Sequence, residues 1–136
     1  MKVYLASPWF TNYEEFIYNL VIDEYRKQGI DFYIPREYSI PNGKNMSNAE
    51  WGHAVFMQDI DAIDSCDEVW VINHGLYSDT GTAWECGYAY AKGKVVRQFV
   101  ADVGTEYSLM MLNGCDEVQT MKCIDECFKE FTPIVK

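Results

Sequence analysis

The chain has little positive charge. Its 136 residues include 11 Lys and Arg against 21 Asp and Glu, which gives a formal net charge of −10. This balance disfavours a nucleic-acid polymer or an anionic membrane as a partner, because both carry negative charge. A small nucleotide stays compatible with it, since the charge of a local site can differ from that of the whole chain.

Signatures of metal, phosphate-loop and serine-hydrolase sites are missing as well. The five cysteines form no CxxC pair, and both histidines lie far in sequence from Cys123 and Cys127, so we expect no metal site. Neither a Walker loop nor a GxGxxG or GxSxG motif occurs. No apolar run has the length of a membrane span, and MKVYLASPWF does not have the pattern of a signal peptide. With free thiols, these features predict a cytoplasmic protein.

Apolar side chains are abundant. They make up 49% of the chain and aromatics 15%, which is enough for the core of a single domain over residues 1–136. The aromatics fit a core and a subunit interface, or alternatively a pocket that stacks on a flat ligand. We find no internal repeat, low-complexity tract or linker.

Short apolar segments alternate with helical patterns along the whole chain. This alternation predicts an α/β fold, a single-domain flavodoxin- or Rossmann-like three-layer sandwich with a mostly parallel five-stranded sheet. Ligands of such folds bind where the strands end, here at the loops 7–12, 73–82 and 101–108. The expected strands are 2–6, 30–34, 66–73, 95–100 and 115–119, and the expected helices are 13–28, 49–64, 78–92, 108–112 and 120–131.

Capping residues and one long loop punctuate this pattern. Thr11 or Asn12 is expected to cap the first helix, and Ser47 or Asn48 the second. The loop 36–47 is long enough to suggest a function. The second helix is expected to pack through Trp51, Val55, Phe56, Ile60 and Ile63.

One carboxylate stands out in the segment SDTGTAWECGYAYAKGK, residues 78–94. Glu85 lies early in a helix of small residues, which leave room beside it for a substrate, and the positive end of the helix favours its ionised form. The alternative is a surface glutamate or half of a salt bridge. Asp79 precedes it by six residues, and its alternative role is a helix cap.

Four more side chains are candidates for a site. Asp59 belongs to the acidic run MQDIDAIDSCDE, which could equally be a solvated helix face. Tyr4 lies in the first strand, where a core tyrosine with a bonded hydroxyl is the alternative. Trp9 and Phe10 follow a proline in a loop, as anchors of that loop or as a stacking wall.

Three segments together resemble the nucleoside 2-deoxyribosyltransferases, from Val3 to about Val118. They read VYLASPWF, MQDIDAIDSCDEVWVI and DTGTAWECGYAYAKGK, with one Asp 26 residues and another six residues before Glu85. The resemblance implies transfer of the 2-deoxyribosyl group between purine or pyrimidine bases through a covalent intermediate, with net retention from two inversions. It implies no cofactor.

The resemblance also implies a role for each candidate residue. Glu85 would be the nucleophile, and the hydroxyl of Tyr4 would hold it in place. Asp59 would exchange a proton with the departing or entering base, and Asp79 would bind the sugar hydroxyls. The base-side wall would be formed by Trp9 and Phe10.

The segment Tyr107-Ser108-Leu109-Met110 departs from the family pattern. In the transferases a neighbouring subunit supplies an Asn here, so Ser108 and Met110 would reach a neighbour's sugar site in a dimer or a trimer of dimers. A serine is similar to the related deoxynucleoside 5′-monophosphate N-glycosidases, where it helps bind phosphate. Those hydrolases have a serine in place of Asp79, however, and an aspartate would repel a 5′-phosphate.

The expected ligands are therefore free 2′-deoxynucleosides and nucleobases. The first alternative is an N-glycosidase, in which water captures the intermediate instead of a second base. The second is a non-catalytic nucleotide-sensing module, which fold alone does not exclude. A sensor has no need of the nucleophile Glu85, and this favours an enzyme.

Overall fold

The computed structural model describes residues 1–76, 79–101, 106–121 and 134–136. Its strands form one sheet in the order β2-β1-β3-β4-β5, and every strand pair is parallel. This is the flavodoxin-like order and confirms the expected fold class. The strands are β1 (Lys2–Ala6), β2 (Asp31–Tyr33), β3 (Glu68–Asn73), β4 (Val95–Val100) and β5 (Glu117–Thr120).

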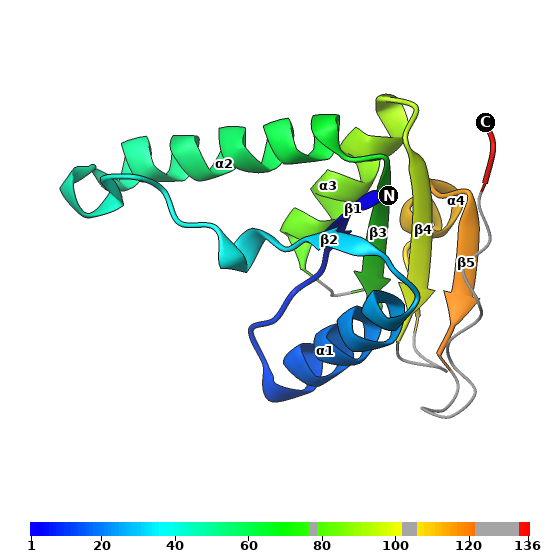
Figure 1. The fold of residues 1–136 in the computed structure, drawn as a ribbon. Coiled ribbons are helices and arrows are strands. Elements are labelled where there is room, and N and C mark those ends of the chain that lie inside the picture. The colour runs from blue at the N-terminus through cyan, green and yellow to red at the C-terminus, as the bar shows by residue number, and fades with distance from the viewer. Residues whose placement is uncertain (77–78, 102–105, 122–133) are drawn as a thin grey trace.

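Helices cover both faces of the sheet and complete three layers (Figure 1). One face packs against α1, and the other packs against α3, α4 and the end of α2. All six residues of the central strand β3 are buried, as expected for a strand covered on both sides. The helices are α1 (Asn12–Lys27), α2 (Asn48–Ser65), α3 (Thr80–Ala91) and α4 (Leu109–Asn113).

The first two helices begin at capping boxes. Thr11 accepts a hydrogen bond from the backbone N–H of Glu14, whose side chain accepts one from the N–H of Thr11. Ser47 and Glu50 repeat this arrangement at the start of α2. The structure thus selects Thr11 and Ser47 from the two alternatives at each helix.

Several expected boundaries are corrected by the structure. The helix expected over 78–92 begins only at Thr80, because Asp79 caps it. The last helix was expected from residue 120, but Thr120 belongs to β5, and residues 122–133 lie outside the described part of the chain. The segment expected as the loop 36–47 holds the short 3-10 turn η2 (Gly43–Asn45), and a second such turn, η1 (Pro35–Glu37), begins one residue before it.

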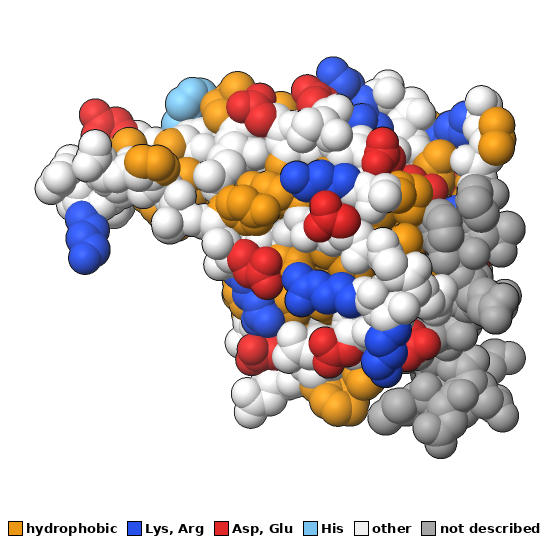
Figure 2. All heavy atoms as spheres, in the orientation of Figure 1, with side chains coloured by type: hydrophobic (Ala, Val, Ile, Leu, Met, Phe, Trp, Pro, Cys, Tyr) orange, Lys and Arg blue, Asp and Glu red, His pale blue; other side chains and the backbone are white. Residues whose placement is uncertain are grey.

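The second helix packs only in part as its sequence pattern predicted. Ile63 is buried, as is Ala62, and Val55 and Ile60 are half-buried, whereas Trp51 is 50% exposed and Phe56 46% exposed. The reason is position: α2 runs well beyond the edge strand β2, so the sheet covers only its last turns (Figure 1). Figure 2 shows this projecting arm, with hydrophobic side chains among polar ones on its surface.

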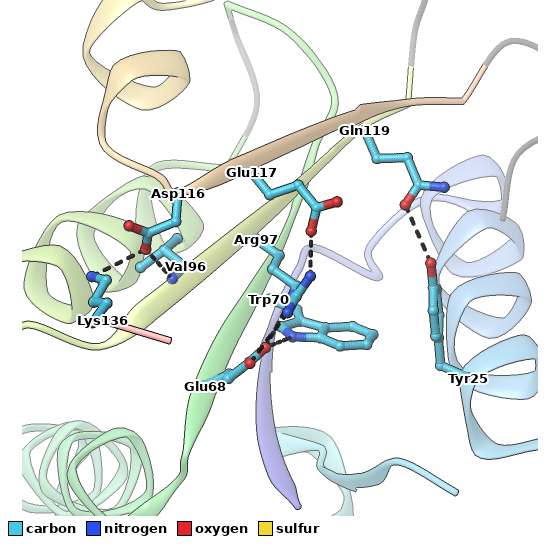
Figure 3. Close-up of polar contacts among 9 residues, drawn as sticks. All are labelled: Tyr25, Glu68, Trp70, Val96, Arg97, Asp116, Glu117, Gln119 and Lys136. Carbon is cyan, nitrogen blue, oxygen red and sulfur yellow. Dashed lines mark hydrogen bonds and ion pairs between the residues drawn. The ribbon is translucent and has the colours of Figure 1, made fainter. Parts of the chain in front are cut away.

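A buried ion network joins the strands near the amino-terminal ends of β3 and β5 (Figure 3). Arg97 on β4 donates from Nε to Oε2 of Glu68 on β3 at 2.8 Å and also contacts Glu117 on β5. The indole N–H of Trp70 donates to the same Glu68 oxygen at 2.7 Å. These contacts tie three neighbouring strands together.

In the described part of the chain, no helix is long and apolar enough to cross a membrane.

Candidate functional site

The centre of the site is a contact between β1 and α3. The hydroxyl of Tyr4 donates a hydrogen bond to Oε2 of Glu85. Tyr4 is fully buried in the strand, and Glu85 lies in the second turn of the helix that crosses the same face of the sheet. The carboxylate is therefore fixed by a rigid element on either side, as a positioned nucleophile requires.

Burial sets the protonation of this pair. It raises the pKa of Glu85 from 4.5 to about 7; the hydrogen bond from Tyr4 lowers it, and the charges of Asp59 and Asp79 raise it further. Burial, followed by the charge of Glu85, also raises the pKa of the Tyr4 hydroxyl, which stays protonated and donating. A pKa of about 7 leaves only part of the Glu85 population ionised near neutral pH. Glu85 lies beyond the first turn, where the helix field has faded.

Asp79, directly before α3, caps the first turn of this helix. Its Oδ2 accepts hydrogen bonds from the backbone N–H of Thr82 at 2.7 Å and from the Thr82 hydroxyl at 2.9 Å. A Cβ at Gly81 would lie only 3.1 Å from that same oxygen, so a glycine leaves space for the cap. Asp79 is a helix cap, as the alternative had it, and its other oxygen, Oδ1, has no hydrogen bond within the described residues.

Asp59 faces Glu85 from the other side of a cavity. The cavity measures about 520 Å³ and lies between α2 and α3. Burial raises the pKa of Asp59 from 3.8 to about 6, so this group can hold or release a proton near neutral pH. The described lining residues are Gly52, Val55, Phe56, Asp59, Ile60, Ile63, Thr80, Gly81, Trp84 and Glu85.

This lining has two chemical properties. It contains two carboxylates and no basic side chain, which suits a reacting centre that becomes positively charged and disfavours an anion. Two aromatic rings, Phe56 and Trp84, flank the carboxylates and contact each other edge-to-face at 5.2 Å between centroids. They remain 46% and 49% exposed, so the cavity is open to solvent in a single chain.

Sequence reasoning did not single out Phe56 and Trp84 as site residues. The signal was present in part, because Phe56 lies three residues before Asp59 and Trp84 lies directly before Glu85. Helical spacing puts Phe56 on the same face of α2 as Asp59. Only the packing of α2 beside α3 shows that both rings border one cavity.

Trp9 and Phe10 are not among the described residues that line this cavity. Trp9 packs at 6.0 Å against Tyr18 of α1, on the opposite side of the sheet from Glu85, and at 5.2 Å against Phe10. Phe10 is 69% exposed. Trp9 thus packs as a loop anchor does, and Phe10 projects from the same loop into solvent, while the base-side wall that the resemblance implies stays a prediction.

Ser108 and Met110 lie on the other side of α3 from Glu85. They border a second cavity of about 570 Å³ together with Ala83, Cys86 and Gly87. Ser108 caps α4 by accepting from the N–H of Met111 at 3.5 Å, and Met110 is 84% exposed. A single chain does not bring these two residues to its own Glu85.

In the described residues, no group of three or more His, Cys, Asp or Glu side chains is arranged to hold a metal ion. Cys66, Cys86 and Cys115 are free thiols. Burial raises the pKa of each, which makes them poor thiolate donors.

Comparison with known proteins identifies the family of the chain. A family model described as nucleoside 2-deoxyribosyltransferase matches residues 3–126. A solved 2-deoxyribosyltransferase from Bacillus psychrosaccharolyticus is 31% identical, with a TM-score of 0.73 over 93% of this chain and 89% of its own. A search of curated protein sequences found no match.

Two more distant structures share the fold. A conserved protein from Enterococcus faecalis V583 is 20% identical, with a TM-score of 0.71 over 88% of this chain and 91% of its own. The CMP N-glycosidase BcmB from Clostridium botulinum is also 20% identical, with a TM-score of 0.59 over 93% of both chains. The family match covers almost the whole chain, including Tyr4, Asp59 and Glu85, and the chain therefore belongs to the nucleoside 2-deoxyribosyltransferase family.

Proposed function

We propose that the protein transfers the 2-deoxyribosyl group of a 2′-deoxynucleoside to a second purine or pyrimidine base. One observation carries this proposal. Glu85, held by the Tyr4 hydroxyl, lines a cavity opposite Asp59. Aromatic side chains border this cavity, and its described lining has no basic side chain. A carboxylate nucleophile and a carboxylic proton donor on two facing helices suit glycosyl transfer with a covalent intermediate.

The first half-reaction breaks the bond between the sugar and the first base. An oxygen of ionised Glu85 attacks the anomeric carbon, and the electron pair of the C1′–N bond leaves with the base. Protonated Asp59 gives its proton to that base. The carboxylates stabilise the positive charge that develops on the sugar ring, and Tyr4 keeps Glu85 oriented.

The second half-reaction reverses these steps with a new base. A nitrogen of that base attacks the anomeric carbon, the bond from C1′ to Glu85 breaks, and Asp59 takes up the proton that the base loses. Each step inverts the anomeric carbon, so the product has the configuration of the substrate. Glu85 and Asp59 return to their starting protonation states, and neither atoms nor electrons are left over.

A base-exchange assay tests this function. The protein is incubated with thymidine or deoxyinosine plus adenine, with parallel samples that lack adenine or contain the 5′-monophosphate, and the products are separated by chromatography. We expect deoxyadenosine only where both the deoxynucleoside and adenine are present. Free base and deoxyribose released without an acceptor would instead establish an N-glycosidase.

Hydrolysis is the second candidate, and a specific observation favours it. Phe56 and Trp84 at the cavity mouth are about half exposed in one chain, which lets water approach Glu85. Transfer needs a drier cavity in which a base competes with water. The choice between the two reactions therefore depends on what covers this mouth.

A second copy of the chain is the cover that we propose. Leu109 and Met110 are 76% and 84% exposed beside Ser108, and α2 exposes Trp51 and Phe56. Apolar side chains exposed on two surfaces of one chain suit a symmetric homo-oligomer in which each surface covers the other. Ser108 and Met110 of one copy would then reach the cavity of its partner, in a dimer or a trimer of dimers.

Subunit complementation is the expected result of such sharing. Glu85→Gln removes the nucleophile and Ser108→Trp blocks the surface that reaches the partner, so each variant alone is expected to be inactive. In a mixed dimer one site carries both defects and the other neither, which restores roughly a quarter of wild-type activity after random exchange of subunits. Two variants that stay inactive after mixing, in a sample shown to contain mixed oligomers, would contradict the shared site.

Asp79 is expected to select nucleosides over 5′-monophosphates. Its charge lies at the start of α3 beside Gly81, a lining residue of the cavity, and would repel a phosphate on the sugar. We predict that Asp79→Ser weakens use of deoxynucleosides and raises relative use of 5′-monophosphates about tenfold. Serine also caps helices, so α3 should still form. Comparing kcat/KM for thymidine and its 5′-monophosphate checks this, and an unchanged ratio would remove Asp79 from the specificity argument.

A further inference from the structure

Three tyrosine rings form a stack that ends at the nucleophile's partner. Tyr4 and Tyr33 have ring centroids 5.6 Å apart and planes inclined by 13°. Tyr33 and Tyr38 are closer, at 4.3 Å and 12°. We call these three residues the tyrosine stack. It runs from the buried hydroxyl that binds Glu85 to the surface, where Tyr38 is 47% exposed.

The sheet register places Tyr33 against Tyr4. The two residues are direct partners in the parallel pair of β1 and β2. On the other side, Tyr4 is paired with Val69 of β3. The ring of Tyr4 therefore lies between two side chains of neighbouring strands, of which Tyr33 is the larger, and both Tyr4 and Tyr33 are buried at 0% and 7% exposure.

Tyr33 also lies near the second carboxylate of the site. Burial is the main cause that raises the pKa of Tyr33 to about 12, and the charge of Asp59 is the next. A single side chain thus packs on Tyr4, which holds Glu85, and stands close to Asp59. No step of the proposed reaction uses its hydroxyl.

We propose that Tyr33 is a positioning residue, whose ring holds Tyr4 in the orientation that presents its hydroxyl to Glu85. The inference rests on the proposed function for its effect on turnover, but the contact itself is a property of the fold. A phenol can swing about its side-chain bonds when a neighbouring ring is removed. The hydrogen bond to Glu85 depends on the Tyr4 oxygen staying in place, since such bonds weaken steeply with distance and angle.

The kinetic test separates the ring from the hydroxyl. Tyr33→Leu removes the stacked ring, and Tyr33→Phe keeps it. We expect Tyr33→Leu to lower kcat for base exchange roughly 10- to 100-fold at a nearly unchanged KM, because the nucleophile is misplaced while the substrate still binds. Tyr33→Phe is expected to keep wild-type kcat. A loss in Tyr33→Phe equal to that in Tyr33→Leu would overturn the role of the ring.

A matched control is available on the opposite face of the sheet. Tyr25 is equally buried, at 3%, and packs edge-to-face on Trp70 at 4.7 Å, away from Glu85. Tyr25→Leu should therefore cost stability comparably but leave kcat per folded molecule unchanged. If Tyr33→Leu does not fold, Tyr38→Ala replaces it, because this exposed ring supports Tyr33 from outside. It is expected to lower kcat in the same direction but less.

A second measurement does not need turnover. The titration of the Glu85 carboxyl is followed by NMR with carbon-labelled glutamate. Tyr4→Phe should raise the Glu85 pKa, since the hydrogen bond from Tyr4 favours the ionised form. Tyr33→Leu should shift it in the same direction, and Tyr25→Leu should not shift it.

The outcomes distinguish this inference from the proposed function. A Glu85 titration in Tyr33→Leu that matches wild type and Tyr25→Leu would overturn the positioning role. Absence of base exchange in the wild-type protein, together with a shifted titration in Tyr33→Leu, would reject the proposed reaction and support the positioning role.

Discussion

Replacing Glu85 with alanine is expected to abolish base exchange. The variant loses the atom that would bond to the sugar, and no other described carboxylate has both the Tyr4 contact and access to the same cavity. Loss of a catalytic nucleophile lowers kcat by roughly 10³- to 10⁶-fold. The measurement is the rate of deoxyadenosine formation from thymidine and adenine, with circular dichroism to show that the fold is intact.

The control is an exposed carboxylate on the other face of the sheet. Asp23→Asn should leave the rate unchanged, since this residue is exposed on α1, away from Glu85. Mass spectrometry of wild-type protein quenched during turnover should detect a deoxyribosyl adduct that Glu85→Ala lacks. Near-wild-type turnover in Glu85→Ala would reject Glu85 as the nucleophile and, with it, the covalent mechanism.

The pKa values of Glu85 and Asp59 also predict a narrow pH optimum. Turnover needs ionised Glu85, whose pKa is about 7, and protonated Asp59, whose pKa is about 6, so between these values the reactive form is the less populated of the two singly protonated states. Activity should therefore fall as pH drops below about 6, where both groups are protonated, and as it rises above about 7, where both are ionised. Asp59→Asn should remove one limb of this profile, whereas Asp61→Asn, an exposed neighbour, should not.

The same burial makes ionised Glu85 destabilising for the folded protein. Its pKa is raised in the folded protein, so the native state binds the proton more tightly than the unfolded chain. The resulting stability is fully present below about pH 4.5, the ordinary value, and is lost as pH rises through about 7. Glu85→Gln should therefore stabilise the protein at pH 8, by on the order of 2 kcal/mol, while it removes activity.

Replacing Arg97 with alanine is expected to cause a large loss of stability. Arg97 and Glu68 are 5% and 4% exposed, and two guanidinium nitrogens contact the two Glu68 oxygens at 2.8 Å and 3.4 Å (Figure 3). Removing the cation leaves the Glu68 carboxylate buried, with only the Trp70 N–H as a side-chain partner among the described residues. Breaking such a pair costs about 3–5 kcal/mol in the free energy of unfolding. Urea denaturation at pH 7 measures it.

Two further variants in the Arg97 ion network serve as controls. Glu117 is 38% exposed, so Glu117→Gln should cost less than about 1 kcal/mol although it also contacts Arg97. Combining Arg97→Met with Glu68→Gln removes both charges and should recover much of the loss of Arg97→Ala. A loss below about 1 kcal/mol in Arg97→Ala would show that solvent reaches Glu68 after the change.

Much of the fold and part of the site could be predicted from the sequence. Apolar runs such as that of β3 have the composition of buried parallel strands, and Thr11 and Ser47 are residue types that cap helices. Such signals depend only on residues that are neighbours in the chain, so they can be recognised in the sequence. The resemblance to the family, rather than any local pattern, pointed to Asp59, Asp79 and Glu85 together, and the order of strands and helices brings their segments to one edge of the sheet.

Only the tertiary structure decided the rest. Whether Phe56 faces a core or a cavity depends on how far α2 runs past the sheet, which no periodicity records. The pKa of Glu85 depends on burial by residues distant in sequence, and this outweighs the helix field that the sequence suggested. Ser108 lies on the far side of α3 from Glu85, because the path of the chain after β4 takes α4 there. Sequence determined which residue types meet at the edge of the sheet, and packing decided their distances, their protonation and their exposure, since these depend on neighbours that the chain brings together only on folding.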